Sequence, residues 1–169
     1  MDSSNFRRGI FSKLRGCGFR RSASLMRRDG ESVIVLIGVE KGFGQQHFVT
    51  VGFFLTGVSS EIPKKIAKSH LYLRWERLFP NVKETVLRAG DLSDPGQSDA
   101  YSRLLEFVES KACNELTQLA TVKNLISAYR DGRLGSGLIT KEARTYFEEF
   151  GTKLAGVQEH GVQTRGHRK

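Results

Sequence analysis

Four polar side chains of different chemistry alternate with apolar ones near the middle of the chain. The polar residues are His70, Tyr72, Arg74 and Glu76, and the residues between them are Leu71, Leu73 and Trp75. Because side chains two and four positions apart on a strand point to the same face, the alternation predicts a strand over 70–78 with the four polar groups on one face. They would then form either a small binding groove or a solvated sheet face with charge pairs between strands.

A second set of candidate residues is basic. The net charge is +9, and residues 1–30 carry eight Lys or Arg against two acids, whereas residues 91–120 carry six acids against two bases. A basic face favours acidic partners such as nucleic acid, an anionic membrane surface or an acidic protein. The residues that would form it are Arg7, Arg8, Lys13, Arg15, Arg20, Arg21, Arg27, Arg28, Lys64, Lys65 and Lys68. Such a face would either bind phosphates in a salt-sensitive way or serve only to keep the protein in solution.

No other pattern of residues indicates a catalytic, metal or cofactor site. The four histidines are scattered, and no Cys or His pair has the spacing of a zinc site. The glycine-rich stretch 132–137 follows a helical pattern rather than a strand, so it predicts a hinge and not a nucleotide-binding loop. No serine lies in a nucleophile elbow. The sequence therefore predicts a protein without metal, cofactor or catalytic residues.

The two cysteines, Cys17 and Cys113, have no partner at metal-ligand spacing, and nothing resembling a secretory signal precedes them. We therefore predict reduced thiols and a cytoplasmic protein, with a disulfide as the alternative. The longest apolar stretch is too short and too interrupted to cross a membrane as a helix, so no membrane span is predicted.

Apolar segments predict the sheet that must position these residues. Residues 33–39 are rich in β-branched residues and apolar at both odd and even positions, which is typical of a central strand covered on both faces. Residues 40–46 are polar with two glycines and predict a hairpin connection to a second apolar strand over 47–55. Residues 24–28 carry charges that favour an edge strand, and 82–87 predict a short further strand.

Helical spacing of apolar residues marks both ends of the chain. Phe6, Ile10 and Leu14 predict a first helix capped by Asn5, and Gly16-Cys17-Gly18 ends it.

Three further helices are predicted towards the C-terminus. The first runs from Asp99 to Leu119 over about five turns. Thr121 and Thr140 are expected to cap the next two. From residue 156 onward the composition predicts a flexible basic tail.

Together these elements predict one α+β domain over residues 1–155, with a sheet-rich part (1–90) and a helical part (99–155). The expected architecture is an antiparallel sheet of four to five strands, an N-terminal helix and two to three C-terminal helices.

Three short motifs resemble those of a mostly bacterial family. They are Gly18-Phe19-Arg20-Arg21, Phe48-Val49-Thr50-Val51-Gly52, and the segment from His70 to Leu78 with Arg74 inside it. In this order the chain resembles the domain of unknown function 4304 family over about residues 6–130. It lacks the Trp-rich segment that often follows the Arg-containing strand, and it has an additional third helix. The resemblance implies an α+β fold and supplies no activity.

The function that these patterns favour is a non-enzymatic module that binds a protein partner through its sheet face or helical end. By analogy, a bacterial accessory, defence or toxin-neutralising role fits such a small domain. The alternative is a nucleic-acid-associated protein that binds phosphates through its basic face. A third hypothesis is an enzyme that uses a groove of His70, Arg74 and Glu76. The sequence leaves open whether the protein is a monomer or a homodimer.

Overall fold

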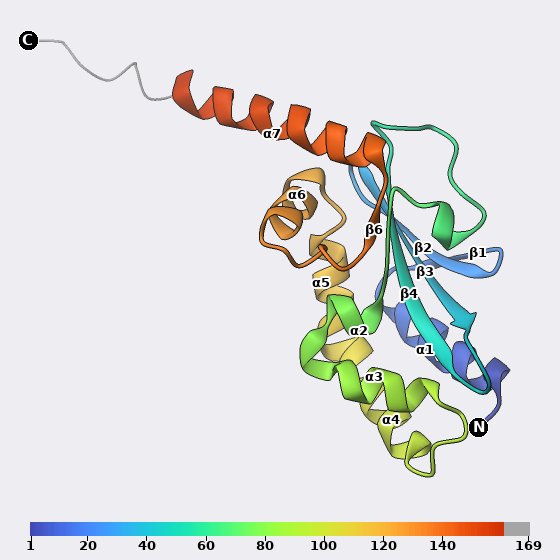
Figure 1. Ribbon diagram of the computed structural model, residues 1–169. Coiled ribbons are helices and arrows are strands. Elements are labelled where there is room, and N and C mark those ends of the chain that lie inside the picture. Colours follow the sequence, from blue (N-terminus) through green and yellow to red (C-terminus); the bar gives the residue numbers. More distant parts are fainter. Residues whose placement is uncertain (161–169) are drawn as a thin grey trace, which may run out of the picture.

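The computed structural model describes residues 1–160, of which 153–160 are described by their backbone only. An antiparallel sheet lies beside a group of helices, which confirms the α+β class (Figure 1). The sheet has six strands in sequence order, so each strand pairs with the next one along the chain. They are β1 (Arg20–Ser22), β2 (Leu25–Asp29), β3 (Val33–Lys41), β4 (His47–Leu55), β5 (Leu71–Arg74) and β6 (Leu138–Ile139).

The long hairpin of β3 and β4 forms the centre of the sheet, as the apolar runs predict. The two strands pair over their whole length, from Val33 opposite Leu55 to Lys41 opposite His47. Their side chains are buried on both faces over most of that length. One face packs against the helices in the main core, and the other carries a smaller apolar cluster that includes Leu36, Phe54 and Ile66.

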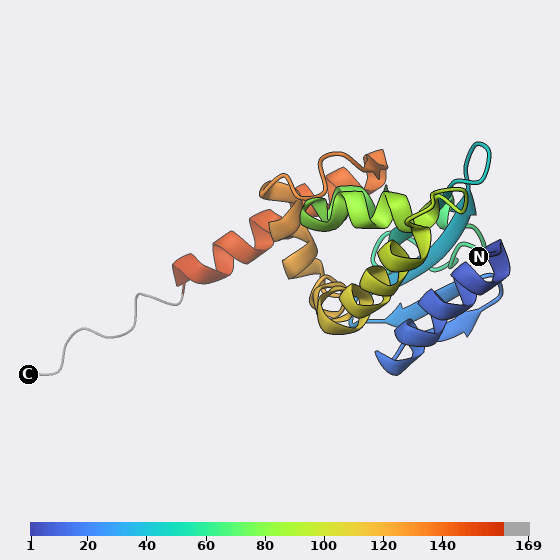
Figure 2. The same ribbon diagram turned by 90° about the horizontal axis from the view of Figure 1, so that it is seen from below.

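The described part of the chain also contains eight helical elements of at least four residues. They are α1 (Ser3–Gly16), α2 (Trp75–Leu78), α3 (Lys83–Gly90), α4 (Gln97–Phe107), the π-helical turn η3 (Val108–Ala112), α5 (Cys113–Gln118), α6 (Val122–Arg130) and α7 (Lys141–His160). Two short 3₁₀ turns are η1 (Ile66–Lys68) and η2 (Pro80–Val82). Helix α1 lies beside the continuous α4–η3–α5 rod on one face of the sheet (Figure 2).

The second face of the sheet is partly covered by the segment that contains η1. Gly52 on β4 permits this approach, because a Cβ atom there would lie 2.2 Å from the Ser69 hydroxyl oxygen. Ile66 of η1 is buried against this face. The same segment carries Lys64 and Lys65, which are therefore held at the edge of the sheet.

The number and limits of the strands differ from the sequence prediction. The sheet has six strands rather than four or five, because β1 and β6 are too short for alternation to reveal them. Residues 24–28 do not form an edge strand, since β2 is flanked by β1 and β3. The edge strand on this side is β1.

The predicted strand over 70–78 ends at Arg74, and α2 begins at Trp75. Trp75 and Leu78 are both buried, so this part of the segment follows helical spacing. Residues 82–87 also form no strand, because most of them belong to α3. Its buried residues Val86 and Ala89 lie three positions apart on one helical face.

The helix ends were predicted with mixed success. Thr121 and Thr140 cap the helices that follow them, through hydrogen bonds donated by the backbone amides of Asn124 and Ala143. The prediction of Asn5 as the first cap is wrong, because Asp2 accepts a hydrogen bond from the Asn5 amide over 2.8 Å. The helix ends at Gly16 as predicted, and Gly18 follows with φ of +82°, a value that glycine adopts without strain.

The predicted C-terminal tail starts too early. Residues 156–160 still belong to the backbone of α7, so the helix is longer than its apolar stripe suggested. The remaining residues of the predicted tail, 161–169, lie outside the described residues.

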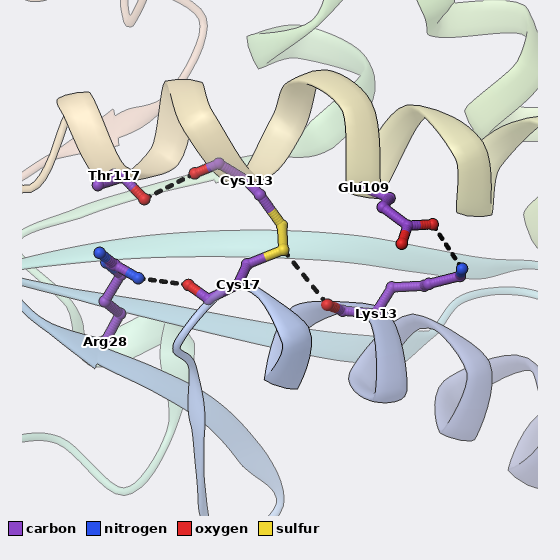
Figure 3. The surroundings of a disulfide bond; sticks show 6 residues. All are labelled: Lys13, Cys17, Arg28, Glu109, Cys113 and Thr117. Carbon is purple, nitrogen blue, oxygen red and sulfur yellow. Dashed lines mark hydrogen bonds and ion pairs between the residues drawn. A yellow bond between two sulfur atoms is a disulfide. The ribbon is translucent and has the colours of Figure 1, made fainter.

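A disulfide joins the end of α1 to the start of α5 (Figure 3). It links Cys17 to Cys113 across 96 residues of sequence, with their Cα atoms 5.8 Å apart. An ion pair between Lys13 and Glu109, 2.6 Å long, connects α1 to the same rod one turn away. The prediction of two reduced thiols is therefore wrong. Their separation along the chain hid the pair, because only the packing of α1 on the rod brings them together.

None of the helices in residues 1–160 combines the length and the apolar character that a membrane crossing requires.

Candidate functional site

Arginine side chains gather where α1 runs beside the edge strand β1. Arg7, Arg8 and Arg15 come from the face of α1 next to its buried stripe, and Arg21 comes from β1. Arg21 is paired with Met26, which belongs to the main core, so it lies on the side of the sheet that α1 covers. With Ser4 and Phe11 these four arginines line a cavity of about 220 Å³, which we call the arginine groove.

The charge of the arginine groove is uncompensated. No carboxylate lines it, and none of its four guanidinium groups takes part in an ion pair with a described residue. Arg7 donates a long hydrogen bond of 3.5 Å to the Val39 carbonyl, and Arg21 donates one of 3.1 Å to the Ala23 carbonyl. Arginine stays charged at all physiological pH values and carries five N–H donors. Most of those donors therefore have no partner among the described residues, and the Nε of Arg7 is buried without one.

A second cavity of about 220 Å³ continues the basic surface beyond Arg7. Arg7 lines both cavities, and Lys64 and Lys65 of the η1 segment line the second one. The one carboxylate there, Glu40, accepts a 2.5 Å hydrogen bond from the Tyr72 hydroxyl. Six basic residues from three separate parts of the chain therefore meet along one edge of the protein.

Five predicted members of the basic face line neither cavity, namely Lys13, Arg20, Arg27, Arg28 and Lys68. Lys13 pairs with Glu109. Arg20 and Arg27 both pair with Asp29, the second over 2.6 Å, on the opposite side of the sheet from Arg21. Arg28 donates a hydrogen bond to the Cys17 carbonyl and lies 6.0 Å over the Phe19 ring. Arg20, Arg27 and Arg28 therefore stabilise the β1–β2 hairpin and the end of α1. Their guanidinium groups are less available to a ligand than those of the arginine groove.

The turn between β1 and β2 holds an unusual backbone. Ala23 has φ of +52° and, apart from glycines, is the one described residue in the left-handed region. A side chain in that region costs roughly 1–2 kcal/mol. The carbonyl of Ala23 accepts the hydrogen bond from Arg21. The turn therefore helps to orient one guanidinium group of the arginine groove.

His70 is buried and lines neither of the two basic cavities. Its Nδ1 accepts a 2.8 Å hydrogen bond from the Leu55 amide, and its ring stacks on Phe54 at a centroid distance of 4.7 Å. Burial lowers the pKa of His70, and the nearby Glu142 carboxylate opposes that shift only in part. An imidazole that accepts at Nδ1 must be neutral there, which agrees with the direction of the shift.

The other three residues of the predicted groove contact one another or their neighbours. Burial and then the hydrogen bond to Glu40 raise the pKa of Tyr72 to about 12. The Arg74 guanidinium lies 3.6 Å over the Phe48 ring. It also lies 3.9 Å from the carboxylate of Glu76, which is 7% exposed and belongs to α2.

The structure therefore corrects the predicted groove. Tyr72 and Arg74 share a strand face as expected, whereas Glu76 is carried by a helix and His70 contacts Phe54. Within residues 1–160, one Glu76 oxygen is buried without a hydrogen-bond partner. The four side chains do not converge on one open surface.

Arg15 was predicted, with Arg7 and Arg8, as a member of the basic face, and it lines the arginine groove. It lies seven and eight positions after Arg8 and Arg7, which places all three on adjacent rows of one helix surface. Helical spacing therefore carried the signal. The contribution of Arg21 had no such signal, because it depends on how α1 docks against β1.

The described part of the chain holds no group of three or more His, Cys, Asp or Glu side chains that could bind a metal ion. Comparison of the chain with models of protein families, with curated proteins and with solved structures finds no match. The resemblance to the domain of unknown function 4304 family stays a prediction.

Proposed function

We propose that the protein binds nucleic acid through the phosphate groups that its arginine groove receives. The observation that carries this proposal is the gathering of Arg7, Arg8, Arg15 and Arg21 in one groove without a carboxylate. Like charges held together repel one another, so an anion that enters the groove relieves this repulsion. A guanidinium group also binds a phosphate through two parallel hydrogen bonds, which suits this ligand.

The adjacent lysines extend the proposed surface along the polyanion. Lys64 and Lys65 lie across Arg7 from the rest of the arginine groove, so several phosphates in a row would meet positive charge. Contacts of this kind position a nucleic acid without reading its sequence. We therefore expect weak discrimination between sequences and a strong dependence on salt.

A salt-dependent titration tests the proposal. Random-sequence single- and double-stranded DNA and RNA are titrated with the full chain, and we expect log–log slopes of about −2 or steeper. In Arg8→Gln/Arg15→Gln the slope should be shallower by about one to two units. Absence of binding at low salt would contradict the proposal.

Arg20→Gln/Arg27→Gln is the matched control, because it removes the same charge a short distance away. Both of these arginines already pair with Asp29, so their loss should change affinity much less. Equal losses in the two double variants would mean that only net charge matters. The arginine groove would then not be the binding site.

The protein-interaction module that the sequence favours, including an accessory, defence or toxin-neutralising role, stays a prediction. We rank it second because no described feature indicates a protein partner as directly as the arginine groove indicates an anion.

The enzyme hypothesis also stays untested, and the arrangement of His70, Arg74 and Glu76 adds no support to it. The cytoplasmic location loses one of its grounds, because a disulfide is typical of oxidising compartments.

A further inference from the structure

A groove on the other side of the helical part has the features of a small-molecule site. Its lining residues belong to α2 with η2, to the η3–α5 segment and to the loop that follows α6. Its volume is about 620 Å³, within the range of roughly 300–1,000 Å³ that ligand pockets occupy. None of its lining residues belongs to the arginine groove, so an inference about it is independent of the proposed function.

The charge of this groove is positive. Its basic residues are Arg77, Lys111 and Arg133, and its single carboxylate, Glu115, pairs with Arg133 over 2.8 Å. Arg77 donates one hydrogen bond of 2.6 Å to the Ser136 carbonyl, which leaves its other donors for a ligand. Lys111 is exposed and has no ion-pair partner among the described residues. Two cations therefore remain for an anionic group.

The floor of the groove is apolar and aromatic. Phe79 is buried and Phe107 half-buried, and their rings meet edge to face at a centroid distance of 5.1 Å. Asn81 and Asn114 stand at the rim with side-chain amides that both donate and accept hydrogen bonds. A flat ring that carries polar edges fits such a surface, because its faces need apolar contacts and its edge needs directional partners.

Two irregular backbone segments build the walls. The π-helical turn η3 interrupts the α4–α5 rod at the point where Ser110 and Lys111 line the groove. Turns of this type are rare and frequently occur at functional sites. The opposite wall is the glycine-rich loop 132–137, in which Gly132 has φ of +76°. The loop that the sequence predicted as a hinge is fixed to the two other walls by Arg77 and Arg133.

We infer that this groove binds a small molecule made of a phosphate group and a planar ring, with the size and chemistry of a nucleoside monophosphate. Arg77 and Lys111 would hold the phosphate, and the ring would lie towards Phe107 with its edge near Asn81 or Asn114. The groove and the arginine groove thus take ligands of related chemistry at separate places.

Isothermal titration of the full chain at low salt tests this inference with AMP, CMP, adenosine and inorganic phosphate as probes. We expect one tight site for AMP or CMP, because the arginine groove would meet only the phosphate group, and at least about tenfold weaker binding of adenosine and of phosphate alone. Lys111→Glu should weaken nucleotide binding at least about tenfold, because it replaces an attractive charge by a repulsive one. Asn114→Trp should abolish binding by filling the groove.

Two controls locate the site. Lys123→Glu makes the same charge change at an exposed position of α6 outside the groove, and we expect an affinity within about twofold of the parent. Arg8→Gln/Arg15→Gln should also leave the affinity unchanged. No binding of either nucleotide at about 5 mM would overturn the inference. So would a loss in Arg8→Gln/Arg15→Gln with none in Lys111→Glu and Asn114→Trp, or phosphate binding as tightly as AMP.

Discussion

Two groups of arginines lie within the first 30 residues and differ in what surrounds them. Arg7, Arg8, Arg15 and Arg21 face a shared groove with no carboxylate. Arg20 and Arg27 instead pair with the Asp29 carboxylate, and Arg28 donates to the Cys17 carbonyl and lies over the Phe19 ring. Equal side chains therefore have different roles. An arginine paired with a carboxylate of the same hairpin holds the fold together, whereas one without a counter-charge keeps its charge available for an anion.

The contrast is sharpest between neighbours on a strand. Arg20 and Arg21 are adjacent, but successive side chains of a strand point to opposite faces. Arg20 is paired in register with Arg27, and both reach Asp29. Arg21 is paired with Met26 and lies on the α1 side. The total charge of residues 20–29 therefore says little about how much unpaired positive charge lies on the α1 side of the sheet.

Removing the disulfide should have the largest effect, because it holds the helix that carries three of the groove arginines. In the loop-entropy model a bridge over 96 residues stabilises the fold by about 4–5 kcal/mol. We expect Cys17→Ala/Cys113→Ala to lower the free energy of unfolding in urea by about that amount. The parent should lose similar stability on reduction, while the double variant should not respond to reductant. A parent that unfolds identically with and without reductant would contradict the bridge.

Arg28 tests whether the paired arginines are structural. Arg28→Gln removes the hydrogen bond to the Cys17 carbonyl and the contact with Phe19, and we expect a loss of about 2 kcal/mol in urea unfolding. Nucleic-acid affinity measured on the folded protein should stay unchanged. Arg20→Gln is the control, because the Arg20 side chain is 67% exposed and such an ion pair contributes less than about 1 kcal/mol. A drop in affinity without a drop in stability would place Arg28 among the ligand-binding arginines.

Charge-conserving substitutions distinguish guanidinium recognition from charge alone. Arg8→Lys/Arg15→Lys keeps the net charge but loses the planar pair of donors. We expect nucleic-acid affinity to fall about fivefold, with little change in the salt slope. Fluorescence anisotropy at several salt concentrations measures both quantities. Parent-like affinity would show that the groove attracts phosphates only as point charges.

Ala23 tests the turn that orients Arg21. Glycine adopts the observed φ of +52° without strain, so Ala23→Gly removes a cost of roughly 1–2 kcal/mol and adds unfolded-state entropy of about 0.4–1 kcal/mol. We expect a net stabilisation of about 0.5 kcal/mol by thermal unfolding. Ser24→Gly, at a position without positive φ, should destabilise instead. The opposite order of the two variants would rule out this turn geometry.

His70 extends the comparison to the other predicted polar surface and should give the smallest effect near neutral pH. Its pKa is lower in the folded protein than the ordinary value near 6.5, so the unfolded chain takes up a proton first as the pH falls. Stability should therefore decrease from about pH 6.5 downward, until the folded protein is protonated as well. Urea unfolding between about pH 5 and pH 8 should show a weaker pH dependence in His70→Gln. Parallel curves for the two proteins would contradict the buried neutral imidazole.

Local signals predicted much of the fold. The unbroken apolar runs of β3 and β4 and the caps at Thr121 and Thr140 follow from interactions over a few residues. The same alternation over 70–78 misled the prediction after Arg74, because Trp75 and Leu78 satisfy a helical spacing equally well. A short apolar segment can fit both the two-residue period of a strand and the longer period of a helix. Only its packing against the core decides which of the two it forms.

The candidate site was less predictable than the fold. Six of the eleven basic residues predicted from sequence line the two basic cavities, namely Arg7, Arg8, Arg15, Arg21, Lys64 and Lys65. The positions of Arg21 and of the lysines depend on how distant elements pack, and the partners of Arg20, Arg27 and Arg28 depend on strand register. A short stretch of sequence determines neither the packing of distant elements nor the register of paired strands.

By itself the sequence determined the fold class, the central hairpin and an excess of positive charge at the N-terminal end. These properties follow from side-chain periodicity, backbone propensity and composition, all of which act locally or as sums. The tertiary structure alone decided that Cys17 meets Cys113, that His70 is buried, and that four arginines share a groove. The reason is physical: burial, pairing and counter-charge are properties of neighbours in space, and packing brings together residues that the chain keeps far apart.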